Sequence, residues 1–169
     1  GIWLVDVYFM VFIHLGSRRI WISPCTEQPT GEWTTQQGRN FQMHLDDNDL
    51  NCETLMRDRD GKYTSAFDSV FNSTTCEIKL TPIRSPNLQA HVERAIQSIK
   101  HEVLNAFCIV TNQHLDGILR KTQDWYNHRR CHSSREHLPP IPDETPTVLA
   151  RFSKTQVVCE SEIGGHLMS

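Results

Sequence analysis

The chain has 169 residues, of which 38% are apolar and 22% are charged, and its formal net charge is −3. This length allows one domain with a buried core and is too short for two ordinary domains, and the composition fits a soluble globular protein. The six cysteines include no Cys-x-x-Cys pair, which excludes a small disulfide scaffold, argues against zinc and indicates reduced thiols in the cytosol.

The N-terminal third is expected to begin with strands. Residues 2–13 are largely apolar but are interrupted by Asp6, and the run is too short to span a membrane and lacks the features of a signal peptide. We therefore expect a buried strand there. Residues 5–14 and 18–23 are rich in β-branched and aromatic side chains, which predicts an antiparallel hairpin with its turn at residues 15–17.

Alternating helices and strands are predicted next. Trp33, Gln37, Phe41 and Leu45 recur at steps of four, which predicts a helix over residues 32–45. A short strand is expected at 53–57, a helix at 65–72 and another strand at 76–80, which Pro82 ends.

The second half is predicted to be mainly helical. Apolar stripes at helical spacing predict helices over residues 88–106 and 112–128, followed by an irregular segment at 131–146. A short strand or hairpin is expected after residue 148, ending at Gly164 and Gly165. The order of elements predicts an α/β fold with a mixed sheet, with one domain at 1–142 and a tail at 143–169.

Charge is unevenly distributed along the chain. Residues 84–135 contain eight Lys or Arg against four Asp or Glu, a net charge of +4. The total is −3, so the remaining residues carry a net charge of −7. A basic half can follow a phosphate backbone, although a mixed, solvated helical surface would give the same count.

Two carboxylates stand at positions suited to divalent metal. Asp58 follows a predicted strand, and Glu93 is expected in the first turn of a helix after 34 intervening residues. Carboxylates from two elements can bridge Mg²⁺ ions for phosphoryl transfer. Asp58 and the neighbouring Asp60 also suit a turn, and a first-turn glutamate is favoured by the helix dipole.

Further motifs lie around these carboxylates. Lys100 is seven residues beyond Glu93 and therefore shares its helix face. Residues 126–132 read Tyr-Asn-His-Arg-Arg-Cys-His, residues 17–19 read Ser-Arg-Arg, and residues 82–87 form a Pro-rich loop. In this order, from about Val7 to Pro142, the motifs resemble the DDE catalytic core of retroviral integrases and insertion-sequence transposases.

The resemblance implies a ribonuclease H-like mixed sheet flanked by helices, beginning at that fold's second strand. It also implies metal-dependent DNA strand transfer, with Asp58 and Glu93 as catalytic ligands of two Mg²⁺ or Mn²⁺ ions. DNA is the expected partner of the intact homo-oligomer, without a membrane or a small-molecule cofactor. The positions expected to contact DNA are Arg94, Lys100, Arg129, Arg130 and His132, with Asn127 a further motif position.

One part of the family pattern is not matched. The family's first aspartate precedes the strand identified here with residues 7–14, and Asp6 is the only acidic residue ahead of His14. We therefore expect that the chain, which begins with Gly1, starts after that aspartate and is inactive alone. The alternatives are a non-catalytic DNA-binding or oligomerisation remnant of a mobile element, a metal-dependent nuclease of the same fold class, and a structural protein with incidental carboxylates.

Overall fold

The computed structural model of the chain describes residues 5–74, 76–81, 86–142, 161–162 and 167–168. The chain divides into two compact units. The first unit comprises Gly1–Val11 and Ser23–Val92, and the second comprises Phe12–Ile22 and Glu93–Ser169. No helix among the described residues is both long and apolar enough to cross a membrane.

The predicted N-terminal hairpin is present but shorter than expected. Its strands are β1 (Val11–Ile13) and β2 (Ile20–Ile22), which form a two-stranded sheet. The amide of Ser23 donates to the carbonyl of Met10 at 2.9 Å, and the amide of His14 donates to the carbonyl of Arg19 at 2.8 Å, which is an antiparallel pattern.

The expectation of a buried strand over residues 2–13 is wrong for its described part. Val5 is 56% exposed and Tyr8 is 42% exposed, whereas Phe12 is buried. The reason is that the regular ladder covers only β1, and Tyr8 forms no more than an isolated bridge with Thr26. Residues 2–4 lie outside the described part of the chain.

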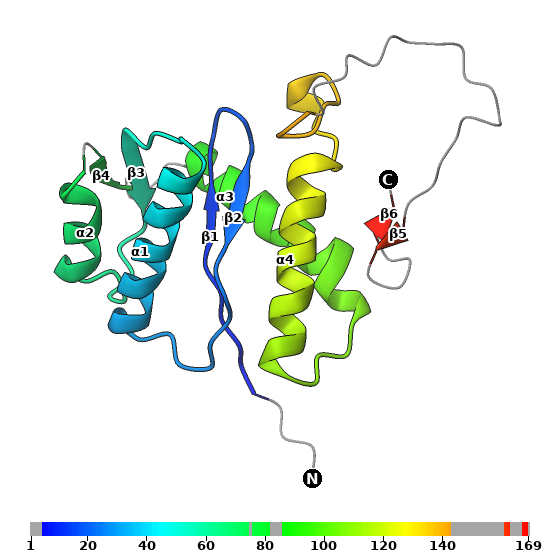
Figure 1. Ribbon diagram of the computed structural model, residues 1–169, viewed down its shortest axis with the longest axis horizontal. Coiled ribbons are helices and arrows are strands. Elements are labelled where there is room, and N and C mark those ends of the chain that lie inside the picture. The colour runs from blue at the N-terminus through cyan, green and yellow to red at the C-terminus, as the bar shows by residue number, and fades with distance from the viewer. Residues whose placement is uncertain (1–4, 75, 82–85, 143–160, 163–166, 169) are drawn as a thin grey trace. The chain divides into compact units, whose positions relative to one another are not determined.

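The first unit contains a parallel strand pair and two helices. Strand β3 (Thr54–Arg57) pairs with β4 (Glu77–Leu80) in a register that places Thr54 opposite Glu77. Helix α1 (Gly31–Asp47) is capped by Thr30, whose hydroxyl accepts a hydrogen bond from the amide of Trp33. Helix α2 (Ser65–Asn72) packs against α1 through buried phenylalanines, and Figure 1 shows both helices beside the strand pair.

The long predicted helix over residues 88–106 is not one α-helix. Helix α3 (Pro86–Ser98) continues as a π-helical turn (Ile99–Val103) and ends in a 3-10 turn (Leu104–Ala106). The predicted apolar stripe is confirmed, because Ala95, Ile99 and Val103 are all buried.

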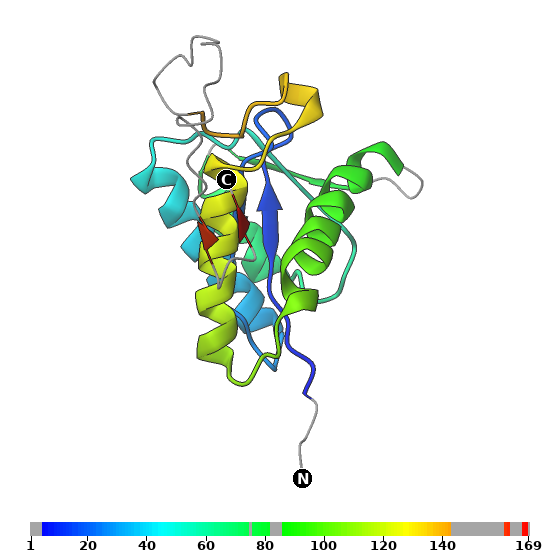
Figure 2. The same cartoon turned by 90° about the vertical axis from the view of Figure 1, so that its right-hand side faces the viewer.

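Helix α4 (Asn112–His128) has the predicted bounds and organises the second unit. Thr111 caps its start by accepting a hydrogen bond from the amide of His114. Its buried face includes Ile118, which packs with Val103. A 3-10 turn (Ser133–Arg135) follows, and Figure 2 shows the hairpin turn and this loop at the same end of the second unit.

The mixed α/β class predicted from the sequence is confirmed. The described strands pair two by two, and the third pair is antiparallel, formed by β5 (Ser161–Glu162) and β6 (Leu167–Met168). The expected strand or hairpin ending at Gly164 and Gly165 stays a prediction, because those two glycines lie outside the described residues. A division of the chain at residues 142 and 143 stays a prediction.

Candidate metal and nucleic-acid site

Asp58 lies directly after β3, as the sequence predicted, and its side chain is exposed. The carboxylate accepts a hydrogen bond from the amide of Asp60 at 3.1 Å, and the carboxylate of Asp60 accepts one from the amide of Lys62 at 2.9 Å. Two successive side-chain turns of this kind shape the loop. The turn-forming role that the sequence allowed for Asp58 is therefore present, and its remaining oxygen sites stay available for a cation.

Arg57 fixes this loop against α2. Its guanidinium donates to both carboxylate oxygens of Asp68, at 2.9 and 2.8 Å, and to the carbonyl of Asp58 at 3.0 Å. The side chain of Arg57 is only 11% exposed, and such two-point Arg–carboxylate pairs are geometrically specific. The sequence did not predict the contact between Arg57 and Asp68. The signal that it offered was the position of Arg57 at the end of a predicted strand, directly before Asp58.

Tyr63 completes the surroundings of Asp58. Its ring lies 5.3 Å from the guanidinium carbon of Arg57. Burial, and then the charges of Asp58 and Asp60, raise the pKa of Tyr63 to about 12. The phenol therefore stays protonated at neutral pH and can act as a hydrogen-bond donor.

Glu93 lies in α3 with an exposed side chain. The expectation that it occupies the first turn is wrong, because α3 begins at Pro86 and has no acidic residue in its first turn. The helix dipole acts mainly within the first turn and so does not explain this glutamate. Arg94 and Lys100 are also exposed, and Lys100 lies within the π-helical turn.

The two metal candidates lie in different units, Asp58 in the first and Glu93 in the second. Their donor chemistry fits Mg²⁺ or Mn²⁺, because both side chains are exposed carboxylates and hard cations prefer oxygen ligands. Within the described part of the chain, no three His, Cys, Asp or Glu side chains gather into a metal-binding group.

The motif at the end of α4 ties this helix to the hairpin. The side-chain oxygen of Asn127 accepts a hydrogen bond from the amide of Ile20 at 2.9 Å, and its side-chain nitrogen donates to the carbonyl of Ile20 at 2.9 Å. One turn earlier, the side-chain oxygen of Gln123 accepts from the amide of Ile22 at 2.6 Å. These contacts supply β2 with hydrogen bonds that a neighbouring strand would otherwise provide.

Arg130, predicted to contact DNA, is oriented by an acidic partner. Its guanidinium donates to the two carboxylate oxygens of Glu102 at 2.7 and 3.1 Å and to the hydroxyl of Ser98 at 3.0 Å. The hydrogen bond from Arg130 is the largest cause of the lowered pKa of the Glu102 carboxyl. Arg129 is exposed.

His132 lies in a strongly positive environment. Its ring packs edge-on against Tyr126 at a centroid distance of 5.0 Å. Burial and then the charges of Arg130, Arg18 and Arg135 lower the pKa of His132 to about 4. The imidazole is therefore neutral at pH 7.

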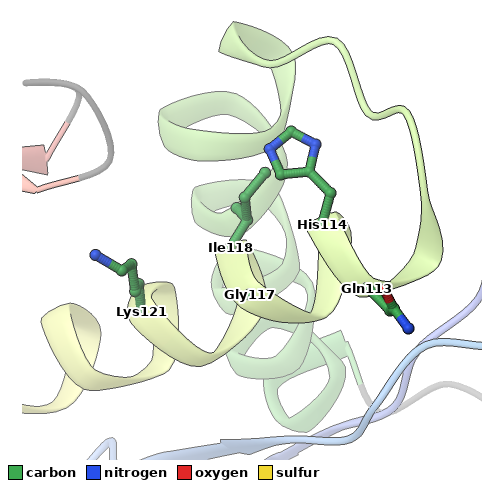
Figure 3. A pocket seen from close by; sticks show the side chains of 5 residues that line it. All are labelled: Gln113, His114, Gly117, Ile118 and Lys121. Atoms are coloured by element: carbon green, nitrogen blue, oxygen red, sulfur yellow. The ribbon is translucent and has the colours of Figure 1, made fainter.

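A shallow depression of about 370 Å³ lies along the first half of α4 (Figure 3). It is lined by Gln113, His114, Gly117, Ile118 and Lys121. None of the predicted metal ligands or DNA contacts is among these residues, so the depression does not mark the candidate site.

Two cysteines that are distant in sequence lie together beside the parallel strands. The sulfur atoms of Cys52 and Cys76 are 3.1 Å apart. Burial is the largest cause that raises the pKa of Cys52 to about 12, followed by the contact with Cys76. Both are free thiols, and their spacing of 24 residues gave no sign of this contact.

A family model described as an integrase core domain matches residues 74–140. The match spans β4, α3 and α4, and it includes Glu93, Lys100 and the motif at 126–132 but not Asp58. A search of curated proteins finds no match to the chain. Residues 74–140 of the chain are therefore similar in sequence to an integrase core domain.

Proposed function

We propose that the chain is the core of an integrase or transposase that joins DNA strands with the help of divalent metal. The match of residues 74–140 to an integrase core domain carries this proposal, because that segment holds Glu93 and the motif at the end of α4. A mixed α/β structure with a parallel strand pair and flanking helices supports a ribonuclease H-like fold.

Asp58 and Glu93 are the proposed ligands of two Mg²⁺ or Mn²⁺ ions. When bound, such ions activate an attacking oxygen and stabilise the leaving oxygen of a phosphoryl transfer. The chain's own contribution at Asp58 is positional, because the Arg57–Asp68 pair holds the backbone carbonyl of Asp58. A fixed carboxylate loses less conformational entropy when a cation binds.

DNA is the proposed partner of the exposed basic side chains. Arg94, Lys100 and Arg129 are exposed, and such side chains position a phosphate backbone without reading its sequence. Arg130 and His132 are proposed to contact the same backbone. We also propose that the intact protein is a homo-oligomer.

Metal affinity tests the ligand assignment. Asp58→Asn and Glu93→Gln are each expected to weaken Mn²⁺ binding by at least about tenfold, because loss of even an outer-shell partner costs about that much in a metal site. Titration calorimetry with MnCl₂ on the full chain measures the effect. Asp60→Asn is the matched control, since it changes a neighbouring exposed carboxylate in the same loop.

Equal losses in Asp58→Asn and Asp60→Asn would show that the loop binds Mn²⁺ only through its overall negative charge. Unchanged binding in Glu93→Gln would remove Glu93 from the site.

With two of the family's three carboxylates matched, we expect this chain alone to join no DNA ends in the presence of Mn²⁺. A strand-transfer assay that yields joined products would contradict that expectation.

A further inference from the structure

The hairpin turn and the loop after α4 meet at one end of the second unit. Asn127 holds Ile20 by two hydrogen bonds, which places the neighbouring Arg18 beside the end of α4. The loop returns to the same point, because the amide of Ile141 donates to the carbonyl of Asn127 at 2.8 Å. Within this loop, His132 bridges to Leu138.

This end of the unit is rich in positive charge. Arg18, Arg130 and Arg135 all lie near enough to His132 to disfavour its protonation. Glu102 is the acidic group that acts on His132, and its carboxylate is already engaged in the two-point contact with Arg130. Among the groups that shift the pKa of His132, no second carboxylate therefore offsets the positive charges of Arg18 and Arg135.

Several polar atoms here are shielded from solvent and lack hydrogen-bond partners among the described residues. They are Nη1 of Arg18, Nε of Arg19, Nε of Arg135 and Nε2 of His132. Buried polar atoms are normally satisfied, and unsatisfied ones call for a ligand or an ordered solvent molecule. Arginine forks match the acceptor oxygens of phosphate in geometry and charge.

We propose that Arg18, Arg135 and His132, together with Arg130, form a binding site for one phosphodiester of a DNA backbone. This inference rests on the proposed function for its ligand, but neither Arg18 nor Arg135 was expected from the sequence to contact DNA. A phosphodiester has non-bridging and ester oxygens on several sides, so donors from the hairpin and from the loop can reach it together. Inorganic phosphate shares this chemistry and tests the site without DNA.

Binding to a short DNA duplex of arbitrary sequence tests the site. Arg18→Asn removes the charge while tolerating the backbone at Arg18, which has a φ of 66°. Arg135→Gln removes the second charge. Each variant is expected to raise the dissociation constant for the duplex by roughly tenfold. Each is also expected to reduce, by about one, the slope of the logarithm of the binding constant against the logarithm of the salt concentration.

Arg39→Gln is the matched control, because Arg39 is an exposed arginine of α1 outside the basic segment. It is expected to change the dissociation constant by less than about twofold. Arg18→Lys keeps the charge but loses the planar fork, so an intermediate affinity is expected. Equal weakening by Arg18→Asn, Arg135→Gln and Arg39→Gln would overturn the site in favour of non-specific charge attraction.

The imidazole of His132 provides a second measurement. A bound phosphate offsets the positive field, so the pKa of His132, followed by NMR, is expected to rise when the duplex or inorganic phosphate is added. An unchanged pKa at saturating duplex, or no duplex binding by the unmutated chain, would overturn the proposal. A rise with inorganic phosphate but not with duplex would also overturn it, by assigning the site to free phosphate. None of these outcomes depends on Asp58 or Glu93, whose Mn²⁺ titration tests the proposed function separately.

Discussion

Asn127 has a structural role that its motif did not reveal. The sequence placed it at the end of a helix in a motif of DNA-joining enzymes, and the structure shows its amide bonded to both backbone groups of Ile20. An amide is suited to this task because it carries one acceptor and one donor group. The contact joins residues 107 positions apart, which a local pattern cannot predict.

Replacing Asn127 by alanine is expected to destabilise the protein. The variant leaves the amide and carbonyl of Ile20, itself a buried residue, without partners, which costs about 2–3 kcal/mol in the free energy of unfolding. Urea denaturation followed by circular dichroism measures the loss. Asn105→Ala is the control, because Asn105 is exposed and its amide lies against the exposed ring of His101, and it is expected to cost less than about 0.5 kcal/mol. Similar losses in the two variants would show that the Asn127–Ile20 contact adds no stability.

At the scale of elements, the close packing of α1 on α2 depends on Gly38. A methyl group added at Gly38 would lie 3.0 Å from Cε2 of Phe67 and 3.3 Å from Cε2 of Phe71, and both rings are almost fully buried. The predicted stripe of Trp33, Gln37, Phe41 and Leu45 ran beside this glycine without including it. A glycine signals close approach only when the facing helix is known.

Gly38→Ala is expected to lower stability although alanine favours helices. Overpacking a core costs about 1–3 kcal/mol, which exceeds the gain of up to about 1 kcal/mol in helix propensity. Gly117→Ala in α4 is the matched control, because an added methyl group there meets nothing within 4 Å. Thermal unfolding is expected to shift down for Gly38→Ala and up for Gly117→Ala. An upward shift in both would mean that the phenylalanine rings move aside at little cost.

The bounds of α2 and α4 were predicted better than those of the N-terminal hairpin strands, for a physical reason. The bounds of α2 and α4 were read from apolar stripes and polar ends that lie within each segment. Strand length depends on a partner strand, so β1 and β2 are shorter than the apolar runs that predicted them. The π-helical turn after α3 was also missed, because it changes backbone hydrogen bonding without changing the stripe.

At the scale of the whole molecule, sequence spacing predicted the candidate site only in part. The position of Asp58 directly after a strand followed from a local pattern. The orientation of Arg130 by Glu102 did not, because the two residues are 28 positions apart. The proximity of Arg18 to His132 arises from the packing of a hairpin on a helix that comes about a hundred residues later. Electrostatic clusters of this kind depend on tertiary structure.

The same cluster predicts how the stability of the molecule depends on pH. The pKa of His132 is about 4 in the folded protein, against an ordinary value of 6.5. Between these values the unfolded chain binds more protons than the folded chain. The contribution of neutral His132 to the free energy of unfolding is therefore fully present above pH 6.5 and is lost as the pH falls toward 4. The partial exposure of His132 makes the effect smaller than the limit of about 1.4 kcal/mol per pH unit for one proton.

Urea denaturation at pH 7.5 and at pH 5 separates this effect from that of Glu102. The pKa of Glu102 is lowered on folding, so its contribution is present above its ordinary value of 4.5 and is lost only below it. Over this range we expect the unmutated chain to lose more stability than His132→Gln does. His114→Gln is the matched control because its imidazole is exposed on α4. If His132→Gln and the unmutated chain lose stability equally, then the field of Arg18, Arg130 and Arg135 does not act on this ring in solution, and the phosphate site would lose its electrostatic basis.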